Sequence, residues 1–209
     1  MPAVGADVEI RLLTTGRLAE AAALLARSFH RDPLHVHLFP DEEVRARALP
    51  HEFAAACRDG IGLGHVQAAS LGGRLAGVAV WLPPWGYPMS ARRRLRLVPD
   101  AARLYLAAPR SFGRVARFGT AVARAHPPQP YWYLEVVGVD PAAQGRGIGT
   151  RLLRRVLDVA DAAGEPCYLE TDTEANVRWY RGLGFEILAA GVELSPGGPP
   201  FWTMLRQPR

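Results

Sequence analysis

The sequence predicts an α/β protein, and three observations favour this class. Short apolar runs of β-strand type alternate along the chain with longer segments whose apolar residues recur at helical spacing. A glycine-rich stretch, residues 144–150, joins one such strand to one such helix. Hydrophobic residues make up 49% of the 209 residues, which is ample for a core. A chain of this length forms one large domain or two small ones.

Seven strands and five helical segments are expected along the chain. The strands are residues 8–13, 65–70, 75–82, 131–139, 167–171, 184–194 and 201–205. The helical segments are residues 16–29, 42–58, 90–125, 148–163 and 173–182. No internal repeat or low-complexity segment interrupts this order.

Local signals set the ends of the elements in the first half of the chain. Asp32-Pro33 ends the first helix, and Asp41 is a plausible N-cap for the second. Pro50 lies inside this second helix, so we expect a kink or a break there. Gly72-Gly73 between two β-type runs is typical of a hairpin.

Prolines and a capping pattern shape the second half. Pro99 and Pro109 are expected to break the third helical segment. Thr171-x-x-Glu174 resembles a capping box, which predicts that the last helix begins at about Thr173.

The glycine-rich stretch Gln144-Gly145-Arg146-Gly147-Ile148-Gly149-Thr150 indicates an anion site. Glycine lets backbones approach closely, and the first N–H groups of a helix have no partner within it. A P-loop is excluded because it requires a lysine, and all 25 basic residues are arginine. A dinucleotide fingerprint requires a different glycine spacing in a first βαβ unit. On this stretch alone, a purely structural turn is the alternative.

Charge and composition restrict the classes of partner. The net charge of +5 fits an anionic ligand. The one dense basic cluster, residues 92–96, lacks interleaved aromatic residues, so we expect no nucleic-acid partner and interpret it as a solvated helix face. No apolar run is long enough to span a membrane and no signal segment opens the chain, so we expect a cytoplasmic protein without a membrane partner.

Cysteine and histidine usage gives no reason to expect a metal. Cys57 and Cys167 are far apart in sequence and are expected to be reduced thiols. The six histidines form no HExxH pattern, and we interpret His35-x-His37 as packing or surface rather than as a metal-binding pair.

Two motifs resemble the GCN5-related N-acetyltransferases, the GNAT superfamily. Residues 144–149, which follow the strand ending Val136-Val137-Gly138-Val139-Asp140-Pro141, resemble the family's Gln/Arg-x-x-Gly-x-Gly/Ala signature. Asn176 and Tyr180, followed by Leu183-Gly184-Phe185, resemble its Asn-x-x-x-Tyr and Leu-Gly-Phe signature. The two motifs cover roughly the last 80 residues in the family's order and separation.

The resemblance implies a GNAT fold. This fold is a mixed central sheet of about six or seven strands, splayed at the motif strand and flanked by helices. We expect one such domain over residues 1–209, with a helical insertion at about 90–125. The C-terminal third is most similar to puromycin N-acetyltransferase-like proteins, on cues that include Leu169-Glu170-Thr171 and Phe201-Trp202-Thr203-Met204.

The resemblance also implies an activity, the transfer of an acetyl group from acetyl-CoA to the amine of a small molecule by direct attack. The residues it assigns to acetyl-CoA are Val137, Gly138, Val139, Gln144, Gly145, Arg146, Gly147, Ile148, Gly149, Thr150 and Asn176. Tyr180 matches the tyrosine that protonates the departing thiolate, with simple aromatic packing as its alternative role. No metal is implied, and a homodimer is possible because family members are often dimers.

Two carboxylates are candidates for the base that takes the amine proton, directly or through water. Glu135 alternates with Val137 and Val139, so we expect its side chain on their face of the strand. Glu170 is the residue matched in the puromycin-like subgroup, and we favour it slightly over Glu135. For each glutamate, an ion pair with an arginine is the alternative role.

Two further functions stay open at this point. One is acetylation of a protein amine, and the other is a non-catalytic acyl-CoA-binding regulator. The acceptor pocket is expected to come from the first two helices, the hairpin and the 90–125 segment.

Overall fold

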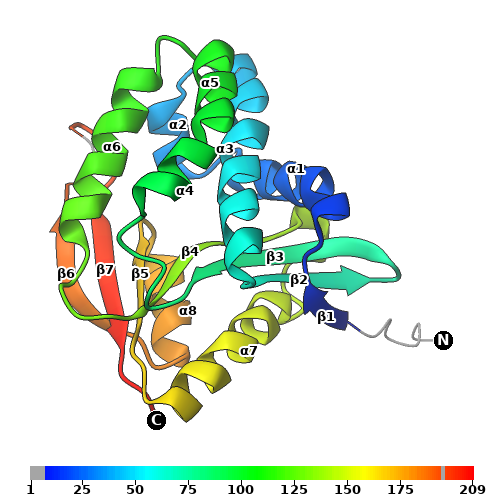
Figure 1. Cartoon of the computed structure of the whole chain (residues 1–209), viewed down its shortest axis with the longest axis vertical. Helices are drawn as coiled ribbons and strands as arrows, with labels where there is room; N and C mark the ends of the chain where they lie inside the picture. The colour runs from blue at the N-terminus through cyan, green and yellow to red at the C-terminus, as the bar shows by residue number, and fades with distance from the viewer. Residues whose placement is uncertain (1–7, 194–195) are drawn as a thin grey trace.

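Seven strands form one sheet in the order β1-β2-β3-β4-β5-β7-β6 (Figure 1). The computed structural model describes residues 8–193 and 196–209. The strands are β1 (Val8–Leu12), β2 (Val66–Leu71), β3 (Arg74–Leu82), β4 (Trp132–Val139), β5 (Cys167–Thr171), β6 (Glu186–Val192) and β7 (Phe201–Arg206). The expected mixed sheet flanked by helices is confirmed, although the last residue of the expected strand 184–194 lies outside the described residues.

Helices cover both faces of the sheet (Figure 1). The helices are α1 (Leu18–Phe29), α2 (Pro33–Leu38), α3 (Glu42–Leu63), α4 (Ala91–Arg96), α5 (Val98–Ala107), α6 (Phe112–Ala125), α7 (Ile148–Ala163) and α8 (Glu174–Gly182). One apolar core lies between the sheet and the helices α1, α3 and α6, and a second lies between the sheet and α7 and α8. The expected breaks near Pro99 and Pro109 are confirmed, since they separate α4 from α5 and α5 from α6.

The sheet opens between β4 and β5. These two strands run parallel and pair only through Trp132 with Cys167 and Tyr133 with Tyr168, although β4 continues to Val139 beside β3. The other neighbouring pairs of described strands are antiparallel. The expected splay at the motif strand is therefore confirmed, and it leaves the second half of β4 with a free edge.

Three local expectations need correction or refinement. The helix does not break at Pro50, since α3 runs unbroken from Glu42 to Leu63. The packing of Leu49 and Phe53 in the core offsets the one backbone hydrogen bond that Pro50 cannot donate. The cap of α8 is Thr173, whose side chain accepts from the Asn176 N–H at 3.3 Å; Thr171 is not the cap. The short helix α2 was not expected at all, and it begins at Pro33 with Asp32 as its N-cap.

Candidate active site

A cavity of about 390 Å³ lies where β4 and β5 diverge. Its walls include residues from both apolar cores, so it extends through the open part of the sheet. The cavity brings together five residues that the sequence predicted for the site, namely Glu135, Val137, Glu170, Asn176 and Tyr180. Helices α1, α3 and α6 contribute to the wall as expected, whereas no residue of the β2–β3 hairpin does.

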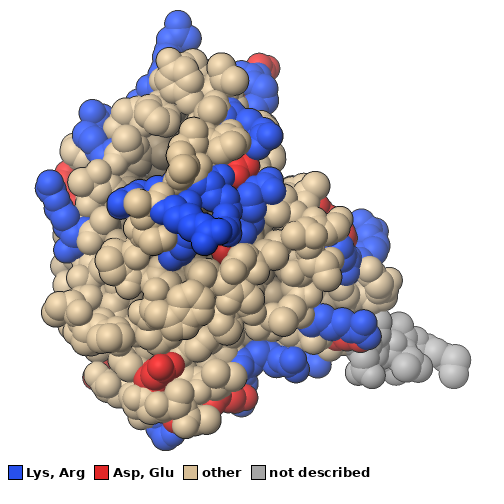
Figure 2. Space-filling view, in the orientation of Figure 1, with Lys and Arg blue, Asp and Glu red and all other residues tan. Residues whose placement is uncertain are grey.

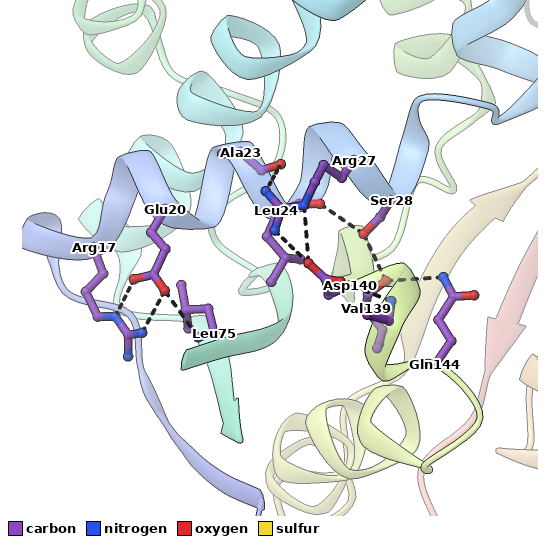
Figure 3. Close-up of polar contacts among 11 residues, drawn as sticks. Arg17, Glu20, Ala23, Leu24, Arg27, Ser28, Leu75, Val139, Asp140 and Gln144 are labelled. Carbon is purple, nitrogen blue, oxygen red and sulfur yellow. Dashed lines mark hydrogen bonds and ion pairs between the residues drawn. The ribbon is translucent and has the colours of Figure 1, made fainter. Parts of the chain in front are cut away.

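The free edge of β4 presents backbone groups to this gap. The Asp140 N–H donates to the Ala76 carbonyl of β3 at 2.9 Å, and backbone groups of successive strand residues point in opposite directions. The backbone groups of Val139 and Val137 therefore point away from β3. The Val139 carbonyl accepts from Ser28 Oγ at 3.0 Å and Gln144 Nε2 at 3.2 Å, so only its N–H remains for a ligand (Figure 3).

Gly138 and Asp140 attach β4 to α1. A Cβ on Gly138 would lie 2.7 Å from Leu25 Cδ2, so glycine is required here for close helix packing. Arg27 pairs with Asp140 at 2.6 Å and fixes the end of the strand (Figure 3). Gly138 thus supports the site through packing, a role that the sequence motif did not distinguish from ligand binding.

The start of α7 has the properties of an anion site. No side chain caps this helix, and its first N–H groups lack partners within the helix. Gly145 and Gly147 have φ of 77° and 70°, values that glycine adopts without strain. Arg146 lies between them and is exposed. Together these features offer unpaired N–H groups and positive charge at the surface.

Two residues of the motif serve the contact between α7 and α8. A Cβ on Gly149 would lie 3.0 Å from the ring of Trp179, so this glycine lets the helices approach. Thr150 Oγ1 accepts from Trp179 Nε1 at 3.0 Å. Ile148 is buried in the core beneath them.

Glu135 lies on the opposite face of the sheet from the one expected. Val80 pairs with Val136 and Trp81 with Leu134, so Glu135 is the extra residue of a β-bulge. The bulge reverses the alternation and directs the carboxyl towards α3 and its Asp59, away from the core that holds Val137 and Val139. Burial, and next the charge of Asp59, raises the pKa of Glu135 to about 8.

Aromatic side chains surround Glu170, and its own side chain is 7% exposed. Burial raises the pKa of this carboxyl to about 7, and the hydroxyls of Tyr133 and Tyr168 oppose the rise. His126, directly after α6, places Nε2 at 3.4 Å from Glu170 Oε1. Burial lowers the pKa of His126 to about 4, so this histidine is neutral at pH 7.

Tyr180 is both packed and part of the cavity wall. The side chain is 5% exposed and contacts the rings of Trp179 and Phe185 at centroid distances of 4.7 and 5.8 Å. Burial, and secondly the charge of Asp172, raises the pKa of its hydroxyl well above the ordinary value. The hydroxyl therefore keeps its proton at neutral pH.

Sequence reasoning missed a second group of ionisable residues in the cavity. His35 is buried, not at the surface, with Nδ1 2.7 Å from Asp32 Oδ1 and Nε2 3.6 Å from Glu52 Oε1. Burial alone would lower the pKa of His35, but Glu52 and Asp32 raise it to about 10. Burial and Asp32 raise the pKa of Asp172 to about 6.

The sequence did contain signals for part of this group. Asp172 lies two residues after Glu170 and so falls on the same side of an extended chain. Asp32 before Pro33 is a helix-start pattern that carries His35 inward. Among residues 8–193 and 196–209, no group of three or more His, Cys, Asp or Glu is arranged to hold a metal ion. No helix of that same part is long and apolar enough to cross a membrane.

The fold and the site define a class of protein in which two diverging strands, an uncapped helix start and a cavity lined by buried carboxylates lie together. The sequence profile of the Acetyltransferase (GNAT) family matches residues 24–185. The chain belongs to this family.

Individual relatives agree with this assignment. The chain is 41% identical over 97 residues to N-alpha-acetyltransferase RimI of Mycobacterium tuberculosis, a match that covers 42% of this chain and 60% of that protein. It is 36% identical over 104 residues to mycothiol acetyltransferase of a Mycobacterium species (strain JLS), covering 46% of this chain and 34% of the relative. The matched part thus spans less than two thirds of either relative.

Solved structures show the same fold over nearly the whole chain. A structure described as histone acetyltransferase HPA2 and related acetyltransferase, from Corynebacterium glutamicum, superposes with a TM-score of 0.71 at 25% identity, covering 97% of each chain. The ribosomal-protein-S18-alanine N-acetyltransferase of Escherichia coli superposes with a TM-score of 0.55 at 16% identity, covering 96% of this chain and 94% of that one.

Proposed function

We propose that this protein is an N-acetyltransferase that transfers the acetyl group of acetyl-CoA to the amine of a small molecule. The observation that carries the proposal is the cavity at the β4–β5 opening, which holds Glu170, Glu135, Asn176 and Tyr180 together. Family membership supports the same activity. We further propose that residues 1–209 act as one domain in which α4 to α6 form an inserted wall of the site.

The residues at the opening fit acetyl-CoA, which supplies the acetyl group as a reactive thioester. The uncapped start of α7, with Gly145, Arg146 and Gly147, would hold the pyrophosphate. The N–H groups of Val137 and Val139 at the free edge of β4 would hold the pantetheine arm, with Asn176 across the gap. One of those N–H groups would also stabilise negative charge on the thioester oxygen.

Proton transfer would be divided between the two sides of the cavity. Glu170 would take the proton of the incoming amine on its carboxylate, and its pKa of about 7 suits a base that works near neutral pH. Glu135, with a pKa of about 8, is the second base candidate. Tyr180 would donate its hydroxyl proton to the leaving thiolate, because burial keeps that proton in place.

A small amine is the preferred acceptor because the cavity is walled by helices α1, α3 and α6. The segments Leu169-Glu170-Thr171 and Phe201-Trp202-Thr203-Met204, which resemble those of puromycin N-acetyltransferase-like proteins, are our reason to propose an antibiotic or metabolite amine. A protein N-terminal amine is the second candidate, and the 41% identity to N-alpha-acetyltransferase RimI favours it.

Release of free thiol from acetyl-CoA over a panel of small amines and N-terminal peptides tests the proposal. We expect turnover of one or more small amines, and Tyr180→Phe should lower kcat by about 100-fold with little change in KM, because only a proton donor is lost. Turnover of peptides alone would support the protein-amine function. Tight acetyl-CoA binding without turnover of any amine would instead indicate a regulator.

A further inference from the structure

The wall of the cavity is strongly acidic, although the chain as a whole is basic. Six acidic side chains line it, and none of the chain's 25 arginines does. The six are Asp32, Glu52, Asp59, Glu135, Glu170 and Asp172. The exposed face around α4 shows the opposite, because basic side chains gather there (Figure 2). The acidic wall is therefore a property of the cavity and not of the general composition.

Internal cations balance only part of this negative charge. Asp59 is paired with Arg93, and His35 is shared by Asp32 and Glu52. Glu135 and Asp172 form no ion pair within 4 Å with a described cation, although the charges of Arg93 and His35 partly stabilise them. The nearest histidine to Glu170 is the neutral His126. More carboxylates than cations thus face the enclosed space, where each unpaired charge is costly.

Three buried carboxylate oxygens in this wall also lack hydrogen-bond partners. They are Oε2 of Glu52, Oε2 of Glu135 and Oε1 of Glu170. Glu170 is nearly enclosed, with 7% of its side chain exposed. Buried acceptors of this kind are normally satisfied by a donor, and an ammonium group supplies several donors together with positive charge.

The acidic residues form two groups. Glu135 and Glu170 act on each other electrostatically from β4 and β5. Asp172 instead interacts with Asp32 and His35, which lie at the start of α2. Glu170 and Asp172 are separated by one residue of nearly extended chain, which places their Cα atoms about 7 Å apart. The cavity therefore offers two acidic positions within the length of a short aliphatic chain.

We propose that the acceptor is a short aliphatic diamine, with one ammonium group at Glu135 and Glu170 and the other held by Asp32, Glu52 and Asp172. This inference rests on the proposed N-acetyltransferase function and specifies its substrate class. The amine at the first group loses its proton to Glu170 and becomes the nucleophile, while the second stays protonated and positions the chain. Phe118 and Val122 of α6 contribute apolar wall, which suits the methylene groups between the two charges.

Equilibrium binding measured by calorimetry, without acetyl-CoA, tests the proposal directly. The probes are 1,4-diaminobutane, butylamine and 4-aminobutanoate, which share a chain length and differ only at the second end. We expect 1,4-diaminobutane to bind with a Kd at least about tenfold lower than butylamine, because a second desolvated ion pair is gained. The carboxylate of 4-aminobutanoate should abolish measurable binding.

Variants of the second acidic group test whether that group causes the preference for the diamine over the monoamine. Glu52→Gln and Asp172→Asn should each raise the Kd of 1,4-diaminobutane by about tenfold and leave that of butylamine within about twofold. Glu43→Gln is the matched control, because Glu43 lies on the same helix as Glu52 and its side chain is 90% exposed. This control should bind both amines like the wild type.

The outcomes separate this inference from the proposed function. Equal affinity of the wild type for the diamine and the monoamine would overturn the inference, and so would variants that weaken both amines alike. Turnover of monoamines with no diamine preference would leave the N-acetyltransferase function intact and remove the diamine. Selective diamine binding without thiol release would support the acidic subsite and contradict the proposed function.

Discussion

Glu170 and Glu135 both line the cavity, but their strands differ in local structure, and the two carboxyls differ in pKa. Glu170 lies in regular strand β5, with tyrosine hydroxyls that stabilise its charge. Glu135 is the extra residue of a bulge in β4, and the nearby charge of Asp59 opposes its ionisation. Because a base must be ionised to act, the carboxyl with the lower pKa is the better base at neutral pH.

The pH dependence of kcat/KM should identify the base. In the wild type, we expect kcat/KM to rise with pH around a midpoint near 7, as Glu170 ionises. Glu170→Gln should remove this rise and lower kcat/KM about 100-fold or more, whereas Glu135→Gln should keep the midpoint near 7. A profile of Glu170→Gln that superimposes on the wild type would exclude this residue as the base. The amine itself ionises near pH 10, well outside this window.

At the scale of elements, the two ends of α7 have nearly the same backbone but different proposed roles. Gly147 at the start and Gly164 at the end have φ of 70° and 67°. Nothing lies within 4 Å of a Cβ built on either residue, so a side chain at each position would act mainly through backbone strain. Only the first end has uncapped N–H groups beside an exposed arginine.

This pair of glycines gives a controlled test of the pyrophosphate site. Gly147→Val and Gly164→Val should each cost about 1–2 kcal/mol of stability, because a left-handed conformation is imposed on a branched side chain. Only Gly147→Val should raise the KM for acetyl-CoA, by about tenfold or more. Thermal unfolding and initial rates measure the two effects. An equal change in KM at both positions would show that the loss is general and not local to the anion site.

The elements themselves were largely predictable from sequence, because their signals are local. Asp41 was expected as an N-cap, and its Oδ1 accepts from the Val44 N–H at 2.9 Å. The Gly72-Gly73 turn also lies where the pattern placed it, with φ of 57° and 81°. The break considered at Pro50 does not occur, because the packing of α3 against the core, which is a tertiary effect, outweighs the local preference.

The site was only partly predictable, because its missing parts depend on contacts between distant segments. Glu170 and Tyr180 were named from resemblances in the local sequence, and both residues line the cavity. The orientation of Glu135 depends on a bulge against β3, which no periodicity within β4 reveals. The charged role of His35 depends on Glu52, a residue of the next helix.

At the scale of the whole molecule, the acidic cavity should make the ligand-free protein less stable as pH rises. A carboxyl whose pKa is raised on folding is bound more tightly to its proton in the folded state, so stability falls between the unfolded and folded pKa values. For Glu135 this window runs from about 4.5 to about 8. The buried His35 acts in the same direction from about 6.5 to about 10, and His126 acts in the opposite direction between about 4 and 6.5.

A comparison of variants isolates the contribution of Glu135 from these other groups. Glu135→Gln removes the ionisation, so its stability relative to the wild type should increase from pH 5 to pH 8, by up to about 1.4 kcal/mol per pH unit. Thermal unfolding at several pH values, without ligand, measures this difference. The exposed control Glu43→Gln should show no such trend. A stability difference between Glu135→Gln and the wild type that stays constant at every pH would mean that burial does not destabilise the ionised form of this carboxyl. In that case the cavity would not carry the unbalanced negative charge that a cationic acceptor is expected to neutralise.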